Sequence, residues 1–179
     1  AASWLIDTVV ECGGRQAGTF LWSVHKGLLR ELKQDSFVGR GYERVRGVVH
    51  LKWVLLTGGE PAQQDLTGLV NALHDAGFKV SLETSGTATG HIGVPVDWVC
   101  VSPKINMPGG LEVLLEVVNQ ADEIKFVVGK SSDLEKLTEL LNRCNLKTGA
   151  QVCLQPLSTN ERATELCIAT VMEMGTWRL

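Results

Sequence analysis

The residues best suited to chemistry follow an apolar run at 53–56 and form the turn Thr57-Gly58-Gly59-Glu60-Pro61. The apolar run is too short for a helix by itself and is typical of a strand that is covered on both faces. The two glycines let the backbone turn sharply and approach a ligand, and Pro61 stops the strand. Ligands of parallel α/β folds bind at the carboxyl ends of the strands, so this turn is a candidate binding site. An ordinary strand-to-helix turn is the alternative.

Polar or turn-forming residues also end the other strands expected along the chain. They include carboxylates, cations, hydroxyls and an amide: Glu60, Glu83, Thr84, Ser85, Ser102, Lys104, Lys125 and Gln155. Because the ends of parallel strands meet on one face, the set predicts a pocket for a ligand with ammonium, carboxylate and hydroxyl groups. For Glu83 and Lys125 the alternative is that they cap strands or pair with each other.

The elements that must position these residues alternate in type from Val48 onward. Strand patterns are expected at 53–56, 79–83, 98–102, 124–128, 152–155 and 177–179, and helical patterns at 66–73, 111–118, 134–144 and 160–174. Asp133 is the expected cap of the third helix. Strand–helix alternation implies parallel strands joined by right-handed crossovers. About six strands are too few for a complete eight-stranded barrel, so an incomplete barrel and a doubly wound sheet both stay open.

The bulk composition indicates one soluble domain. The chain has 179 residues, a hydrophobic content of 44% and a net charge of −3. This charge gives no case for a broad nucleic-acid footprint or an anionic membrane surface. No apolar run approaches the ~20 residues of a membrane-spanning helix. A cytoplasmic protein without nucleic-acid or membrane partners is therefore expected. Residues 1–47 have a weaker pattern, with one amphipathic helix expected at 23–35.

The cysteines and histidines do not form a recognisable metal motif. The five cysteines have no CxxC spacing and an odd count, which favours reduced, mostly buried thiols over a disulfide framework. The four histidines are scattered, with no HExxH or paired Cys/His spacing.

Several of these segments together resemble a known family. They are LLTGGEP, LETSGT, DWVCVSPK followed by NMPGG, ADEIKFVVG, and LQPLS with a helix leading to TWRL. From about Trp53 to Leu179 the chain resembles the radical S-adenosylmethionine superfamily and, within it, the 7-carboxy-7-deazaguanine synthase family of queuosine biosynthesis. GGEP occurs throughout the superfamily, whereas ETSGT, VSPK and LQP in this order are specific to the family. The resemblance implies an α/β fold, an incomplete (β/α) radical-SAM-type barrel with a mostly parallel sheet. It implies one domain over 1–179, with 1–47 divergent or truncated and 48–179 as the strand–helix repeat.

The resemblance also implies a reaction and a set of site residues. The reaction is a radical ring contraction of 6-carboxy-5,6,7,8-tetrahydropterin to 7-carboxy-7-deazaguanine by a lyase that uses S-adenosylmethionine, a [4Fe-4S] cluster and Mg²⁺. A homodimer and a flavodoxin-like reductase partner are implied as well. The cofactor-binding positions are Gly58, Gly59 and Glu60 for the ammonium group, Ser85, Ser102 and Lys104 for the carboxylate and ribose, and Gln155 nearby. Thr57 would lie beside the substrate.

The sequence departs from the family pattern at the iron–sulfur motif. The family has three cysteines in a CxxxCxxC-like loop before GGEP, but Cys12 is the only cysteine before Thr57, and one thiolate cannot hold such a cluster. The segment 3–8 resembles the family's CxWCDT without its cysteines, which would make Thr8 the Mg²⁺-binding threonine. The missing cysteines therefore favour a chain that neither assembles the cluster nor catalyses the reaction. The sequence leaves two hypotheses, a synthase and a non-catalytic, truncated or decayed relative that only binds S-adenosylmethionine or a pterin. An unrelated enzyme with Glu60 or Glu83 as general base ranks last.

Overall fold

The computed structural model describes residues 8–11, 53–105, 110–158 and 160–179. Within them, six parallel strands form one sheet in the order β1-β2-β3-β4-β5-β6. The strands are β1 (Thr8–Glu11), β2 (Trp53–Thr57), β3 (Lys79–Thr84), β4 (Trp98–Val101), β5 (Glu123–Val128) and β6 (Gln151–Pro156). A doubly wound sheet reverses its strand order partway. The sequential order found here shows that this alternative is wrong for the described strands.

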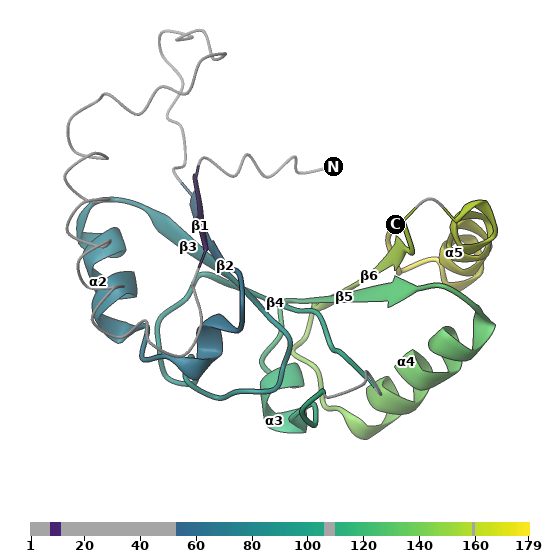
Figure 1. Cartoon of the computed structure of the whole chain (residues 1–179), viewed down its shortest axis with the longest axis horizontal. Coiled ribbons are helices and arrows are strands. Elements are labelled where there is room, and N and C mark those ends of the chain that lie inside the picture. The colour runs from purple at the N-terminus through teal and green to yellow at the C-terminus, as the bar shows by residue number, and fades with distance from the viewer. Residues whose placement is uncertain (1–7, 12–52, 106–109, 159) are drawn as a thin grey trace, which may run out of the picture.

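Helices cover one side of this sheet. They are the 3₁₀ turn η1 (Pro61–Gln63), α2 (Thr67–Asp75), α3 (Leu115–Val118), α4 (Ser131–Arg143) and α5 (Glu161–Met174). Figure 1 shows the sheet as a curved layer with α2, α3 and α4 along its convex side. None of these described helices is long and apolar enough to cross a membrane.

The two faces of the sheet differ because strand side chains point alternately to opposite sides. In β3, Val80 and Leu82 are fully buried, while Ser81 and Glu83 between them are half-buried. The same alternation recurs in β5. The buried series contacts the helices and forms two aliphatic clusters, one around β2, β3 and α2 and one around β4, β5, β6 and α4. The opposite face carries the half-buried residues, which include the polar side chains of Ser81, Glu83 and Lys125.

Most expected elements are confirmed, and the differences have local causes. The helix expected over 111–118 is only one turn long, because residues 110–114 run as an irregular segment with Leu114 in an extended conformation. The strand expected at 177–179 is a single bridge, in which Arg178 pairs with Cys153 at the outer edge of β6. Strand β1 has no counterpart in the sequence analysis. The helix expected at 23–35 lies outside the described residues.

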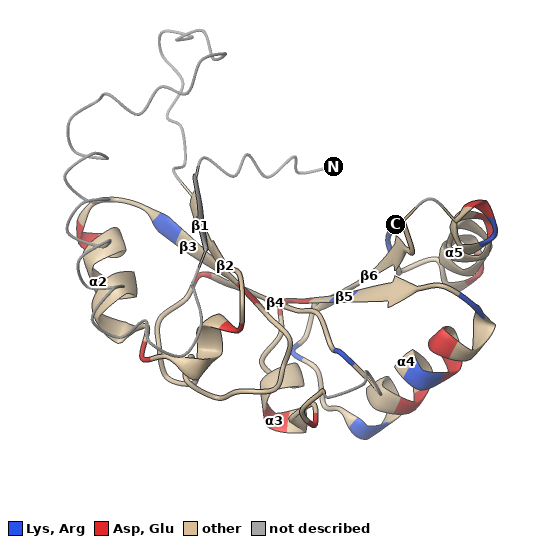
Figure 2. Ribbon diagram, in the orientation of Figure 1, with Lys and Arg blue, Asp and Glu red and all other residues tan. Residues whose placement is uncertain are grey.

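The start of α4 lies three residues before its expected position. The helix begins at Ser131, so Asp133 occupies its third position instead of the cap position. Its Oδ2 nevertheless accepts hydrogen bonds from the backbone N–H groups of Gly129 and Lys130, at 3.0 and 3.1 Å. A carboxylate at this position satisfies donors that the first turn leaves free. Figure 2 shows both signs of charge along α4, whose buried side carries Leu137 and Leu140.

Candidate functional site

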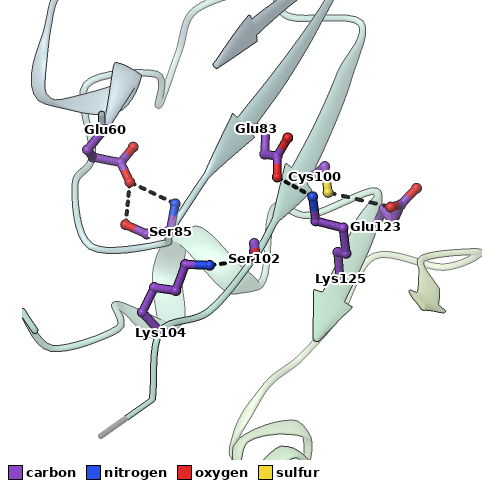
Figure 3. Close-up of polar contacts among 8 residues, drawn as sticks. All are labelled: Glu60, Glu83, Ser85, Cys100, Ser102, Lys104, Glu123 and Lys125. Carbon is purple, nitrogen blue, oxygen red and sulfur yellow. Dashed lines mark hydrogen bonds and ion pairs between the residues drawn. The ribbon is translucent and has the colours of Figure 1, made fainter. Parts of the chain in front are cut away.

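The carboxylate of Glu60 lies at the centre of a hydrogen-bond network that joins the turn after β2 to the end of β3. Gly58 and Gly59 adopt φ values of 84° and 57°, which side-chain-bearing residues rarely adopt, and so direct the chain back toward the sheet. Oε1 of Glu60 accepts hydrogen bonds from the Ala62 N–H (3.1 Å) and the Thr84 hydroxyl (2.6 Å). Oε2 accepts from both the backbone N–H (2.7 Å) and the hydroxyl of Ser85 (Figure 3).

A second group of polar residues follows β4 and adjoins the first. The Ser102 N–H donates to the Thr84 carbonyl at 2.7 Å, which places Ser102 beside the end of β3. Lys104 Nζ donates to the Ser102 hydroxyl at 3.4 Å, while its side chain is otherwise exposed (Figure 3). The structure therefore brings together Glu60, Ser85, Ser102 and Lys104, four residues that the sequence assigned to one pocket. We call them the strand-end site.

Three other expected site residues lie at different places on the sheet. Thr57 ends β2, opposite Glu11 of β1, and therefore lies at the carboxyl edge. Gln155 pairs with Val127 and is exposed on β6, and the described contacts do not join it to the strand-end site. Thr8 pairs with Val54 at the amino end of β1, three positions before the pair that contains Thr57. The backbone pairing thus separates Thr8 and Thr57 along the strands.

Glu83 and Lys125 form an ion pair on the polar face of the sheet. Lys125 Nζ donates to Glu83 Oε1 across the intervening strand β4. The side chain of Lys125 is 30% exposed and that of Glu83 is 29% exposed. On β4, Cys100 lies in register with Glu83 of β3 and Glu123 of β5, and its thiol donates to Glu123 at 3.5 Å (Figure 3). For these two residues the structure shows the alternative left open by the sequence, in which they pair with each other. The polar face is therefore charged in its middle as well as at its carboxyl edge.

The Glu83 carboxylate keeps Lys125 charged to higher pH. Burial alone lowers the pKa of Lys125, but its hydrogen bond to Glu83 and the negative charge of Glu83 outweigh this effect and raise it. A raised pKa in the folded state means that the pair stabilises the fold fully below the unfolded pKa of about 10.5. That stability is lost as the pH rises through the folded-state pKa.

We therefore expect Lys125→Met to lower the free energy of unfolding by roughly 1 kcal/mol at pH 7, since the pair is only partly exposed. The difference from the wild type should disappear as the pH rises above about 10.5. Urea unfolding at pH 7, 9.5 and 11 measures it. Lys147→Met is the control, because the Lys147–Asp122 pair is more exposed, at 44% for the lysine side chain. A difference between Lys125→Met and wild type that does not change with pH would contradict the assignment.

The described residues do not provide a metal centre. No group of three or more His, Cys, Asp or Glu side chains in this part of the chain is arranged to hold a metal ion. Burial raises the pKa of each described cysteine, namely Cys100, Cys144, Cys153 and Cys167. A thiol binds iron as its thiolate. These four cysteines belong to no group of three that could hold a metal ion, and Cys12 lies outside the described residues.

A cavity of about 680 Å³ lies next to the strand-end site but is not part of it. Among the described residues it is lined by Lys104 and Ile105, by residues 110–113 and by the second half of α4. Lys104 is thus the residue that the cavity shares with the strand-end site.

Two members of the hydroxyl network, Thr84 and Thr87, were given no role of their own in the sequence analysis. Thr84 is buried, at 2% exposed, and its hydroxyl both donates to Glu60 and accepts from the Gly86 N–H. The Thr87 hydroxyl lies 2.8 Å from that of Ser85. The run of hydroxyls in Thr84-Ser85-Gly86-Thr87 was the available signal, because one strand end with three hydroxyls offers many donors to a nearby carboxylate.

Comparisons with known proteins agree with this geometry. Over 126 residues, 70% of this chain, the sequence is 44% identical to the 7-carboxy-7-deazaguanine synthase of Escherichia coli strain K12, and the match covers 56% of that protein. It is 34% identical to the enzyme of the same name from Buchnera aphidicola subsp. Schizaphis graminum over 128 residues, 72% of this chain and 56% of the relative. No protein-family model matches the chain.

The fold is similar as well. The structure matches the crystal structure of QueE from Escherichia coli with a TM-score of 0.70 and 36% sequence identity, over 86% of this chain and 62% of that chain. The matches thus span a little over half the length of the sequence relatives. The resemblance found in the motifs is confirmed, and over the region they share this chain is homologous to the 7-carboxy-7-deazaguanine synthases of the radical S-adenosylmethionine superfamily.

Proposed function

We propose that this chain acts as a 7-carboxy-7-deazaguanine synthase-like protein, which converts 6-carboxy-5,6,7,8-tetrahydropterin to 7-carboxy-7-deazaguanine with S-adenosylmethionine as cofactor. The identity of 44% to the Escherichia coli synthase is the observation that carries the proposal. The cluster of Glu60, Ser85, Ser102 and Lys104 at the carboxyl edge of the sheet supports it. The same homology favours the synthase over the non-catalytic alternative.

The strand-end site suits an amino-acid-like cofactor. It combines acceptors around Glu60 with donors at Ser102 and Lys104, which match an ammonium and a carboxylate on one ligand. Gly59 is exposed and has no side chain, so its backbone is open to close approach. Gly58, Gly59 and Glu60 would hold the ammonium through their backbone, with Gln155 near the cofactor and Thr57 beside the pterin. When bound and reduced by one electron from a donor outside the described residues, S-adenosylmethionine would supply the radical that starts the ring contraction.

The iron–sulfur cluster does not fit the residues that the structure describes. Their cysteines are dispersed and carry raised pKa values, and they form no three-ligand group. The proposal therefore derives no step through a cluster. Mg²⁺ binding by Thr8 stays a prediction. The structure describes the backbone pairing of Thr8 with Val54 and not its side chain.

The finer architecture is also part of this proposal. Six sequential parallel strands with helices on the convex side support an incomplete (β/α) barrel that forms one domain over 1–179. The homodimer, the flavodoxin-like reductase partner and the cytoplasmic location stay predictions.

Binding of S-adenosylmethionine tests the site directly. We expect Gly59→Val and Lys104→Ala each to weaken binding by about tenfold or more, measured by titration calorimetry. Gly59→Val forces a side chain into the left-handed φ region, and Lys104→Ala removes a charged donor. Gly68→Val, where an added side chain meets open space, and Lys136→Ala are the matched controls. Unchanged affinity in both folded site variants would show that the cofactor binds elsewhere.

Activity is tested separately from cofactor binding. Iron and acid-labile sulfide are measured after anaerobic reconstitution, together with conversion of 6-carboxy-5,6,7,8-tetrahydropterin. Turnover with a bound four-iron cluster supports the synthase. Tight S-adenosylmethionine binding without iron or turnover would instead support the non-catalytic alternative.

A further inference from the structure

The Glu60 side chain is fully occupied by the protein itself. A carboxylate has only acceptors, with about four lone-pair sites on its two oxygens. Four donors fill them: the N–H groups of Ala62 and Ser85 and the hydroxyls of Thr84 and Ser85. The Glu60 carboxylate is therefore not free to accept a hydrogen bond from a ligand.

This arrangement fixes the direction of the neighbouring hydroxyl groups. A hydroxyl has one proton, and Ser85 uses its proton in the bond to Glu60. In the 2.8 Å contact between Ser85 and Thr87, the Thr87 hydroxyl must then donate and Ser85 must accept. The protons run in one direction, from Thr87 to Ser85 to Glu60. The oxygen of Thr87 is left with free lone pairs and no proton to offer.

The adjoining group has the opposite polarity. Lys104 Nζ carries only donors, and it donates to the Ser102 hydroxyl, so the Ser102 proton is free to point elsewhere. Ser102 is linked to Thr84 through the backbone bond of 2.7 Å. An acceptor group after β3 and a donor group after β4 therefore lie side by side.

We propose that Glu60 is a positioning residue that orients Ser85 and Thr87, and that Thr87 and Ser85 present acceptors for the ammonium end of the ligand while Ser102 and Lys104 hold its carboxylate. This inference rests on the proposed function, since it concerns the S-adenosylmethionine site. It moves Ser85, which the family resemblance assigned to the carboxylate and ribose, to the ammonium side. It adds Thr87 to the site as a residue that determines specificity.

Three probes with different charged groups test this assignment by calorimetry. S-adenosylmethionine has both groups, decarboxylated S-adenosylmethionine has only the ammonium, and 5′-methylthioadenosine has neither. We expect Glu60→Gln and Thr87→Val to weaken the binding of the first two probes equally, by about tenfold. The affinity for 5′-methylthioadenosine should stay unchanged. Lys104→Met should weaken the binding of S-adenosylmethionine more than the binding of the decarboxylated probe. Equal losses for all three probes in Glu60→Gln, or a loss confined to S-adenosylmethionine, would overturn the proposal.

A control and a ligand-free measurement separate the possible failures. Asp122→Asn removes a carboxylate that likewise accepts a backbone N–H, from Val99 at 2.8 Å, but at the amino edge of the sheet. It should lower stability and keep all three affinities. In the ligand-free protein, Glu60→Gln should speed amide hydrogen exchange at Ser85 by about tenfold or more. This measurement tests the hydrogen bonds between Glu60 and Ser85 without any ligand. Unchanged exchange there overturns the positioning role, whereas a wild type that binds none of the probes overturns the proposed function itself.

Discussion

Gly90→Ala is expected to lower the free energy of unfolding by about 1–3 kcal/mol, as overpacked positions do. A Cβ atom at Gly90 would lie 2.3 Å from the carbonyl oxygen of Ala62 and 2.6 Å from that of Gln64. Both are backbone atoms, so the segment that carries Gly90 must move. That segment is held to the turn after Glu60 by the Gly90 N–H, which donates to the Ala62 carbonyl at 2.8 Å.

A nearby histidine reports this movement independently of stability. His91 is 2% exposed, and both ring nitrogens lack a hydrogen-bond partner. Burial lowers its pKa, an effect that the charge of Glu60 partly opposes and that of Lys147 reinforces. In Gly90→Ala the ring should become more exposed, and its pKa should return toward 6.5 when it is followed by NMR titration. The folded-state pKa is lowered, so His91 favours the fold above pH 6.5, and this stability is lost as the pH falls through the folded-state pKa.

Gly68→Ala is the matched control for this substitution. An added Cβ there meets nothing within 4 Å, and the position lies in α2, where alanine is favoured over glycine. It should stabilise the protein slightly and leave the His91 titration unchanged. A Gly90→Ala variant with wild-type stability and a wild-type His91 titration would show that the contact between Gly90 and the Ala62 turn tolerates a side chain.

The strands and most helices could be predicted because their apolar spacing is a local property. Val80 and Leu82 alternate with Ser81 and Glu83, and this pattern of period two survives in the folded sheet. The short α3 could not be predicted in the same way. Leu111, Leu114 and Val118 have helical spacing, yet Leu114 N–H donates to the Gly86 carbonyl at 2.8 Å, and this tertiary bond holds residue 114 in an extended conformation.

The proximity of the polar strand-end residues was predictable from the sequence, whereas their hydrogen bonding was not. Grouping the polar ends of parallel strands correctly placed Glu60, Ser85, Ser102 and Lys104 together. The saturation of Glu60 could not be read from the sequence, because it depends on how Gly58 and Gly59 return the chain toward β3. The docking of Gly90 on the Ala62 carbonyl joins residues 28 positions apart and has no sequence signal of its own.

Cys100 is expected to react with iodoacetamide at neutral pH at least about 100-fold more slowly in the folded protein than in the urea-unfolded chain. The thiolate is the reactive form, and each unit by which a thiol pKa rises reduces the thiolate fraction about tenfold. Burial raises the pKa of Cys100 far above its ordinary value, and the negative charges of Glu123 and Glu83 add to the effect. The side chain is also only 8% exposed. Timed alkylation with mass spectrometry measures the rate at each cysteine.

The same measurement decides which cysteines are available to iron. Iron binding needs several thiolates close together, and the described cysteines belong to no group of three that could hold a metal ion. Replacing Cys100, Cys144, Cys153 and Cys167 together with serine should therefore leave the iron content after reconstitution unchanged. If this variant lost iron, or if Cys100 in the folded protein were alkylated as fast as in the unfolded chain, the polar face would hold a reactive thiol. Cys100 between Glu83 and Glu123 would then be the first place to look for a metal.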